Sequence, residues 1–124
     1  MYGATIGKVG ILDIETTTNQ ACCVLSDTKQ ILEKYAFYWF LASKNNIISL
    51  GYGGGQPNIS QDLIKSLRIT LPPKSEQEKI VEYIETKTAK IDKLANLEQE
   101  YIKSLKEYKA SLIDSVVTGK VRIV

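Results

Sequence analysis

Gly3, Gly7 and Lys8, in the stretch GATIGKV, are the residues whose spacing comes nearest to a known binding motif. A phosphate-binding loop needs four residues between its two glycines and a Ser or Thr directly after its lysine. Here three residues separate the glycines, and Val9 follows the lysine. The stretch VGIL is also typical of a strand, whereas a phosphate loop opens a helix. The spacing therefore argues against nucleotide binding.

The other side chains that could do chemistry are missing or scattered. The chain has no histidine, which removes the commonest general base and metal ligand. Cys22 and Cys23 are adjacent, a spacing that suits neither a mutual disulfide nor a zinc or redox site. No two carboxylates stand out as an acid/base pair. We therefore expect no catalytic residue, no metal site and no cofactor, and we do not expect an enzyme.

Composition and charge place the chain in a broad class. Its 124 residues are enough for one domain, and a hydrophobic content of 44% is ordinary for a folded protein. The net charge of +2 neither favours nor excludes a nucleic-acid partner. No signal peptide is visible, and the longest apolar run, residues 35–42, is much shorter than the roughly 20 residues of a membrane span. We expect a cytoplasmic protein with no membrane partner.

The part of the chain before the double proline at 72–73 has a mixed pattern. Val9, Ile11 and the apolar run 21–25 predict two short strands. The opening MY looks like the middle of a strand, so we expect the domain to be incomplete at its N-terminus. The predicted fold class is α+β, with a small mixed α/β domain over residues 1–73.

Helices are predicted on both sides of the glycine-rich stretch at 51–55. Residues 28–50 predict a helix, because apolar side chains recur there at spacings of three and four. Gly51 occupies the place of a C-terminal cap. After the glycines, a short helix returns the chain to the core through Ile59, Leu63, Ile64 and Leu67.

The part after the prolines predicts one long coiled-coil-type helix within residues 74–124. From Glu76 to about Thr118 there is no proline or glycine. At 1.5 Å per residue, about 43 residues give a helix roughly 65 Å long. Ser75 and Glu78 predict a capping box at its start, and Gly119 predicts its end.

A heptad pattern runs along this helix. Its two seams hold Ile84, Ile91, Glu98, Leu105 and Leu112, and, three residues on, Lys87, Leu94, Tyr101, Tyr108 and Ser115. Positive and negative charges are nearly balanced after Pro73, so we expect an arm that pairs with another helix. The residues expected to make this pairing are Ile84, Ile91, Leu94, Tyr101, Ile102, Leu105, Tyr108 and Leu112.

Four stretches, in the same order, resemble the specificity (S) subunit of type I restriction–modification enzymes. They are GATIGKVGI (3–11), TNQACCVL (18–25), GGGQPNISQDLIKSLRITLPPKSEQEKIVEYI (53–84) and LKEYKASLIDSVVTGKV (105–121). The pattern QPNIS, LPP and SEQEKIV is the most distinctive. The resemblance implies that residues 1–73 are the later part of a target-recognition (DNA-binding) domain. It also implies that residues 74–124 are its conserved helical spacer and dimerisation arm.

The resemblance also implies a function in host defence. In this family two recognition domains each bind half of a split DNA target, and two long helices pair antiparallel. The implied partners are double-stranded DNA, modification (methyltransferase) subunits and, in the full complex, a restriction subunit. The specificity subunit is not catalytic, since a separate methyltransferase uses S-adenosylmethionine. We expect a homodimer, or pairing with another specificity half, through the long helix.

Polar and basic residues on predicted loops are the candidates for DNA contact. They are Lys8, Thr17, Asn19, Lys44, Asn46, Tyr52, Gln56 and Asn58. Lys8 and Lys44 suit phosphates better than bases. Gln56 and Asn58 suit hydrogen bonds to the backbone of the glycine turn better than contacts with DNA, because a glycine-rich bend leaves N–H groups that need acceptors. A second interpretation stays open, in which the chain is a truncated assembly module that oligomerises through its long helix and does not bind DNA.

Overall fold

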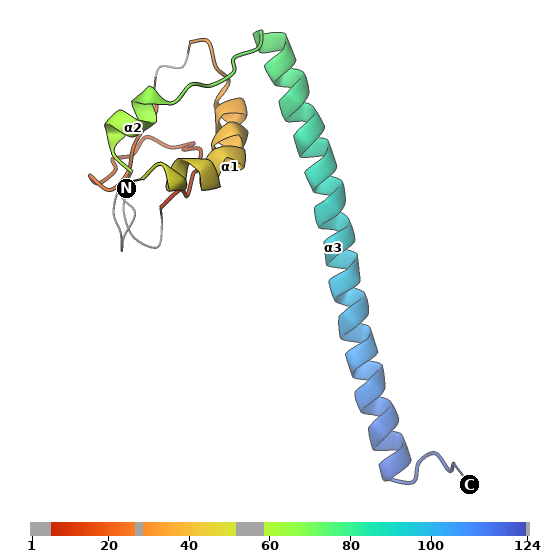
Figure 1. The fold of residues 1–124 in the computed structure, drawn as a ribbon. Helices are drawn as coiled ribbons and strands as arrows, with labels where there is room; N and C mark the ends of the chain where they lie inside the picture. The colour runs from red at the N-terminus through yellow and green to blue at the C-terminus, as the bar shows by residue number, and fades with distance from the viewer. Residues whose placement is uncertain (1–5, 27–28, 52–58, 124) are drawn as a thin grey trace. The chain divides into compact units, whose positions relative to one another are not determined.

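A computed structural model describes residues 6–26, 29–51 and 59–123 of the chain. Within these ranges the secondary structure consists of three helices: α1 (Glu33–Ser49), α2 (Gln61–Ser66) and α3 (Lys74–Val117) (Figure 1). The chain divides into a first unit that ends at Tyr83 and a second unit that begins at Ile84. The first unit therefore includes the opening turns of α3, and the second unit contains the rest of that helix.

The predicted strands are not formed in residues 6–26, and the α+β fold class is wrong for the part of the chain that the structure describes. Val9, Ile11 and residues 22–25 have irregular backbone. A strand needs a neighbouring strand to receive its backbone hydrogen bonds. Here the backbone hydrogen bond is local: the amide of Cys22 donates to the carbonyl of Asn19 at 3.1 Å. Apolar alternation alone thus did not create a sheet, and the described chain is helical.

Helix α1 starts at Glu33 rather than at the predicted residue 28. The residue before it, Leu32, has extended backbone (φ −74°, ψ 136°). Its amide is held by the side chain of Gln77, 45 residues away, so it is not available to a helix. The predicted end is confirmed: Gly51 directly follows the last cap residue, and its amide donates to the carbonyl of Ile48 at 3.0 Å.

A small apolar core joins α1 to α2. Ile47 of α1 packs with Ile59 and Ile64, and all three are buried. Trp39 and Phe40 of α1 lie against this cluster with their rings edge to face at 5.2 Å. Helix α2 is capped by Ser60, whose Oγ accepts the amide of Leu63 at 3.1 Å. The helical return after the glycines is therefore as predicted, although it is short.

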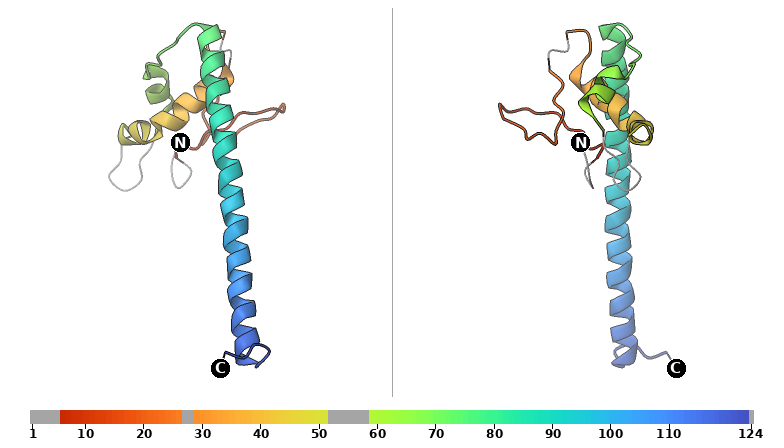
Figure 2. Two further views of the ribbon diagram at one scale, coloured as in Figure 1. Left: turned by 90° about the vertical axis from the view of Figure 1, so that its right-hand side faces the viewer. Right: turned by 60° about the vertical axis from the view of Figure 1, so that its left-hand side comes forward.

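Helix α3 has 44 residues, and the two further views show it as one continuous helix (Figure 2). At 1.5 Å per residue it is about 66 Å long. It begins at Lys74, and the carbonyl of Pro73 accepts the amide of Gln77 at 3.0 Å. Ser75 therefore lies inside the first turn, and the capping box predicted for it is wrong.

The end of α3 was predicted correctly. The helix stops at Val117, and Gly119 has a φ of +74°, a backbone conformation that favours glycine. The amide of Gly119 donates to the carbonyl of Val116 at 3.2 Å. Lys120 adds an ion pair to Asp114 at 2.8 Å. In the described ranges, no helix has both the length and the apolar composition needed to cross a membrane.

Candidate functional site

Lys44 of α1 packs against Gly7, the residue that directly precedes Lys8. Gly7 has a φ of +71°, and a Cβ added to it would lie 3.1 Å from Cγ of Lys44 and 3.1 Å from Cδ1 of Ile48. The stem of Lys44, on α1, therefore packs over the turn that carries Lys8. Lys8 is exposed and Lys44 is half-buried. Two positive charges from distant parts of the sequence thus belong to one region of the first unit.

Thr17 and Asn19 lie in an exposed loop whose hydrogen bonds are local. The side-chain oxygen of Asn19 accepts the amide of Ala21 at 3.0 Å, and its carbonyl accepts the amide of Cys22. This is an Asx-type turn, a common structural use of asparagine. The carbonyl of Thr17 accepts the hydroxyl of Thr16 at 3.4 Å. Asn19 is therefore occupied in shaping the loop, while Thr17 remains an exposed side chain.

Asn46 is exposed in the last turn of α1. Its carbonyl accepts the hydroxyl of Ser49 at 2.7 Å, so its backbone belongs to the helix end. The remaining candidates, Tyr52, Gln56 and Asn58, lie outside the described residues. The structure thus places Lys44 against the turn that carries Lys8, while Thr17, Asn19 and Asn46 are exposed residues.

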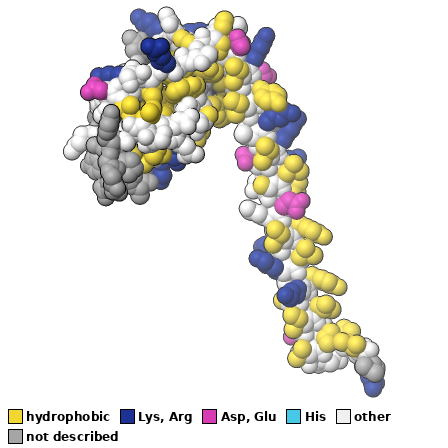
Figure 3. All heavy atoms as spheres, in the orientation of Figure 1, with side chains coloured by type: hydrophobic (Ala, Val, Ile, Leu, Met, Phe, Trp, Pro, Cys, Tyr) yellow, Lys and Arg dark blue, Asp and Glu magenta, His cyan; other side chains and the backbone are white. Residues whose placement is uncertain are grey.

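The predicted pairing face of α3 is exposed along most of its length. Ile84 is half-buried, whereas Ile91 and Leu94 are each 62% exposed. The other exposed members of the face are Tyr101, Ile102, Leu105, Tyr108 and Leu112. Figure 3 shows hydrophobic side chains, in yellow, running down α3. Burying each large apolar side chain is worth about 1.5–3 kcal/mol, so covering this face would be strongly favourable.

Gln77 is a structural residue that the sequence analysis missed. Its side chain is fully buried, with an exposed fraction of 0%. Its Oε1 accepts the amide of Leu32 at 2.8 Å, and its Nε2 donates to the carbonyls of Gln30 at 3.1 Å and Pro72 at 2.8 Å. We call these four residues the Gln77 joint. The spacing in the sequence could have indicated its burial. Gln77 precedes the buried Val81 by four residues, so the two side chains lie on the same face of α3.

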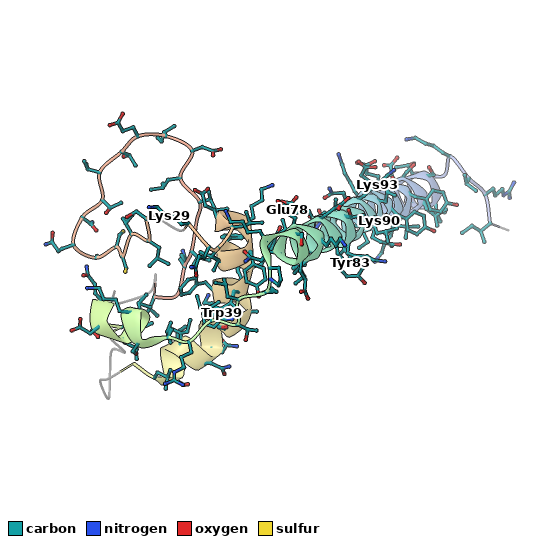
Figure 4. All side chains as sticks on the ribbon, turned by 90° about the horizontal axis from the view of Figure 1, so that it is seen from above. Lys29, Trp39, Glu78, Tyr83, Lys90 and Lys93 are labelled. Atoms are coloured by element: carbon teal, nitrogen blue, oxygen red, sulfur yellow. The ribbon has the colours of Figure 1, made fainter. Side chains whose placement is uncertain are left out.

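A further hydrogen bond adds to the Gln77 joint. Tyr35 of α1 donates its hydroxyl to the carbonyl of Thr70 at 2.9 Å, a second tie between α1 and the segment before α3. Figure 4 shows the side chains from above and labels Trp39 on α1 and Glu78 on α3. In the Gln77 joint, one amide side chain ties together the backbone of Gln30, Leu32 and Pro72. Such an arrangement suits the positioning of chain segments and not catalysis.

Groups for metal or covalent chemistry do not gather in the described chain. Across residues 6–26, 29–51 and 59–123, no three His, Cys, Asp or Glu side chains are grouped so that they could hold a metal ion. Cys22 is exposed and Cys23 half-buried, and both are free thiols. The arrangement offers two lysines at a turn and a long apolar helix face, which are features of binding.

Comparison with known proteins identifies a family and a relative. A family model described as "Type I restriction modification DNA specificity domain" matches residues 1–106. A protein of Methanocaldococcus jannaschii, titled "Putative type I restriction enzyme MjaX specificity subunit", is 24% identical over 121 residues. The match takes in 97% of this chain and 28% of that relative, so the chain spans little more than a quarter of the relative's length. No solved structure matches the chain.

Proposed function

The chain belongs to the family of type I restriction modification DNA specificity domains, and we propose that it is a DNA sequence-recognition component of a type I restriction–modification system. The observation that carries this proposal is the extent of the family match. It includes the turn of Lys8, helix α1 with Lys44, and α3 as far as Lys106. The chain itself carries out no reaction in this proposal, because methylation and cleavage belong to separate subunits.

The proposed DNA contact is made by the first unit. Lys8 and Lys44, which share one region around Gly7, would bind phosphates and so fix the position of the duplex. Thr17 and Asn46 are exposed and carry groups that can bond base edges. Tyr52, Gln56 and Asn58 remain candidates from outside the described residues. Asn19 is the weakest candidate, because its side-chain oxygen already accepts a backbone amide.

The proposed role of α3 is to pair and to position. Its exposed apolar face would pack against a second helix, supplied by another copy or by another specificity half. Two recognition units held on paired helices would bind the two halves of a split target. The same assembly would position methyltransferase and restriction subunits on the DNA. The support for this role is the heptad pattern together with the exposure of its apolar members.

A salt titration tests the DNA contact. We expect the chain to bind duplex DNA with an affinity that falls as salt rises, because counterions are released from phosphates. The variant Lys8→Glu/Lys44→Glu should bind more weakly to every sequence. It should also lower the slope of log K against log salt by about 2, roughly one per phosphate contact. Fluorescence anisotropy with labelled duplexes measures both quantities.

A matched variant controls for net charge. Lys93→Glu/Lys103→Glu makes the same charge change at exposed positions of α3 that belong to the second unit, whereas Lys8 and Lys44 belong to the first. We expect its affinity and salt slope to stay close to those of the unaltered chain. An equal loss in both variants would show that overall charge, and not the Gly7 region, governs binding.

A second candidate function is a pure assembly module that binds no DNA. The nearly neutral charge of +2 and the occupied side chain of Asn19 favour it. The same titration separates the two functions. Absence of binding at low salt, where electrostatic attraction is strongest, would leave the assembly role alone.

A further inference from the structure

Gly7 is enclosed by side chains of α1. A Cβ built on it would lie 3.1 Å from Cδ1 of Ile48, 3.1 Å from Cγ of Lys44 and 3.3 Å from Cε of Lys44. These distances are shorter than the favourable separation of two carbon atoms, which is about 3.5–4.0 Å. The space that a side chain would need at position 7 is therefore already occupied, and two of the three nearest atoms belong to the stem of Lys44.

The backbone at position 7 also favours glycine. Its φ of +71° lies in the left-handed region, where a Cβ would crowd the carbonyl oxygen that follows. This conformation turns the chain between Ile6, which packs against the apolar core, and Lys8, which is exposed. Gly7 thus has two separate properties, a positive φ and a missing side chain, and their consequences can be tested separately.

The missing side chain decides where the end of Lys44 lies. Cε of Lys44 is next to position 7, and the ammonium is one bond further along, so its charge lies beside the turn that carries Lys8. Lys44 is half-buried, whereas Lys8 is exposed. Neither ammonium forms an ion pair with a described residue. Both charges are therefore available to an anion from outside the chain.

Ile48 and Lys44 differ in how easily they could move away from a new Cβ. Ile48 packs against the buried core of the first unit, and close packing fixes its position. Lys44 has a flexible four-carbon stem and is only half-buried. A side chain at position 7 would therefore displace Lys44 in preference to Ile48, and would move its ammonium away from the turn.

We propose that Gly7 is a positioning residue for the DNA contact: its missing side chain seats the stem of Lys44 on the turn and holds the Lys44 ammonium ready for a phosphate of the duplex. Gly7 acts here through the contact proposed above, so the inference rests on that proposed function. A lysine stem that packs against the protein has lost part of its rotamer freedom before DNA arrives. Less entropy is then lost on binding, which is the general advantage of preorganisation.

A glycine of the stretch GATIGKV thus serves phosphate binding without forming a nucleotide-binding loop. In such a loop the glycine-rich backbone cradles the phosphates, and the lysine belongs to the same loop. Gly7 instead makes room for the stem of a lysine from α1. The effect of Gly7 on binding must therefore depend on the presence of Lys44.

A double-mutant cycle on DNA affinity tests this dependence. Gly7→Ala should weaken binding to every duplex by about 3- to 10-fold and lower the slope of log K against log salt by up to about 1, the value of one phosphate contact. Lys44→Met, which keeps an unbranched stem without its charge, should have an equal or larger effect. In the Lys44→Met background, Gly7→Ala should change the affinity by less than about 2-fold, because the charge that it would displace is already absent.

Gly119→Ala is the matched control for backbone strain. Gly119 has a φ of +74°, close to that of Gly7, but a Cβ built on it would meet nothing within 4 Å. Its replacement brings similar strain without displacing a side chain, and it lies in the second unit. We expect its DNA affinity and salt slope to match those of the unaltered chain. Trp39 fluorescence in urea shows under which conditions Gly7→Ala stays folded.

A measurement without DNA tests the seating of Lys44 by itself. Reductive methylation with labelled formaldehyde gives each lysine amine an NMR signal, and Lys44→Arg identifies the signal of Lys44 by its loss. In the unaltered chain this signal should be less mobile than that of Lys93, which is exposed on α3. Gly7→Ala should shift it and make it more mobile, whereas Gly119→Ala should leave it unchanged.

Three results would overturn the inference. They are an unchanged DNA affinity of Gly7→Ala, a loss of affinity that is equally large in the Lys44→Met background, and a Lys44 signal that does not respond to Gly7→Ala. Failure of the proposed function gives a different pattern. If the unaltered chain binds no DNA while the Lys44 signal still responds to Gly7→Ala, the seating of Lys44 stands and its use for DNA is refuted.

Discussion

Gln77 shows at the scale of one residue how a polar side chain can be buried at little cost. A buried amide without partners would be strongly unfavourable. Gln77 instead makes three hydrogen bonds, at 2.8, 3.1 and 2.8 Å, to backbone groups of Leu32, Gln30 and Pro72. Without Gln77, the amide of Leu32 and the carbonyls of Gln30 and Pro72 would lose these hydrogen bonds. The residue therefore stabilises three stretches of chain at once.

Replacing Gln77 should destabilise the first unit. Gln77→Leu keeps much of the volume but leaves one amide and two carbonyls without this partner, at about 1–3 kcal/mol for each group left buried. We expect a loss of at least about 2 kcal/mol in the free energy of unfolding. Urea unfolding followed by the fluorescence of Trp39, the chain's one tryptophan, measures it.

Gln99→Leu is the matched control for this prediction. It makes the same change on α3 at an exposed position. Its unfolding should stay within about 0.5 kcal/mol of the unaltered chain. If the two variants unfold alike, the Gln77 joint does not contribute to stability as described.

At the scale of elements, most of α3 exposes its apolar side chains. Its residues from Thr86 to Asp114 are exposed, and these include the large apolar residues of its pairing face. Helices in proteins owe most of their stability to packing of an apolar face. We therefore expect substitutions on the apolar face of α3 to disrupt assembly.

Charged residues on this face should dissociate the assembly. We expect Ile91→Glu/Leu94→Glu/Leu105→Glu to give a monomer, because several layers of the pair would then hold carboxylates. Light scattering measures the mass. The control Lys93→Glu/Asn96→Glu/Lys103→Glu places three carboxylates on the opposite side and should keep the mass of the unaltered chain. A triple variant of the apolar face with unchanged mass would refute pairing through it.

The elements that could be predicted from the sequence are those set by local signals. Gly51 and Gly119 marked the ends of α1 and α3, and Ser60 caps α2. The start of α1 could not be predicted, because it depends on Gln77, 45 residues further along. The strands were predicted wrongly, because apolar alternation says nothing about whether a partner strand is present. The heptad pattern marked the apolar face of α3, whereas the packing of Lys44 against Gly7, next to Lys8, arises through folding that no spacing reveals.

At the scale of the whole molecule, pairing and stability should be linked. If the second unit is stabilised by a second copy, its unfolding must depend on protein concentration. We expect the melting temperature followed by circular dichroism to rise as concentration is raised from micromolar to hundreds of micromolar. The fluorescence of Trp39 reports the first unit in the same experiment.

The triple Glu variant of the apolar face provides the comparison for this linkage. Its melting should be independent of concentration, since it has no partner to lose. Concentration-independent melting of the unaltered chain would mean that the second unit is stable without a partner.

The partners of Gln77 have one further property: all three are backbone groups. The side chains of Gln30 and Leu32 take no part in these bonds, so other residues at those positions would be held equally well. The joint thus depends on the path of the chain and not on its local sequence. A helical arm that carries this glutamine could be recombined, during evolution or in engineering, with recognition segments of different sequence. If those segments follow the same backbone path, the same three hydrogen bonds would form.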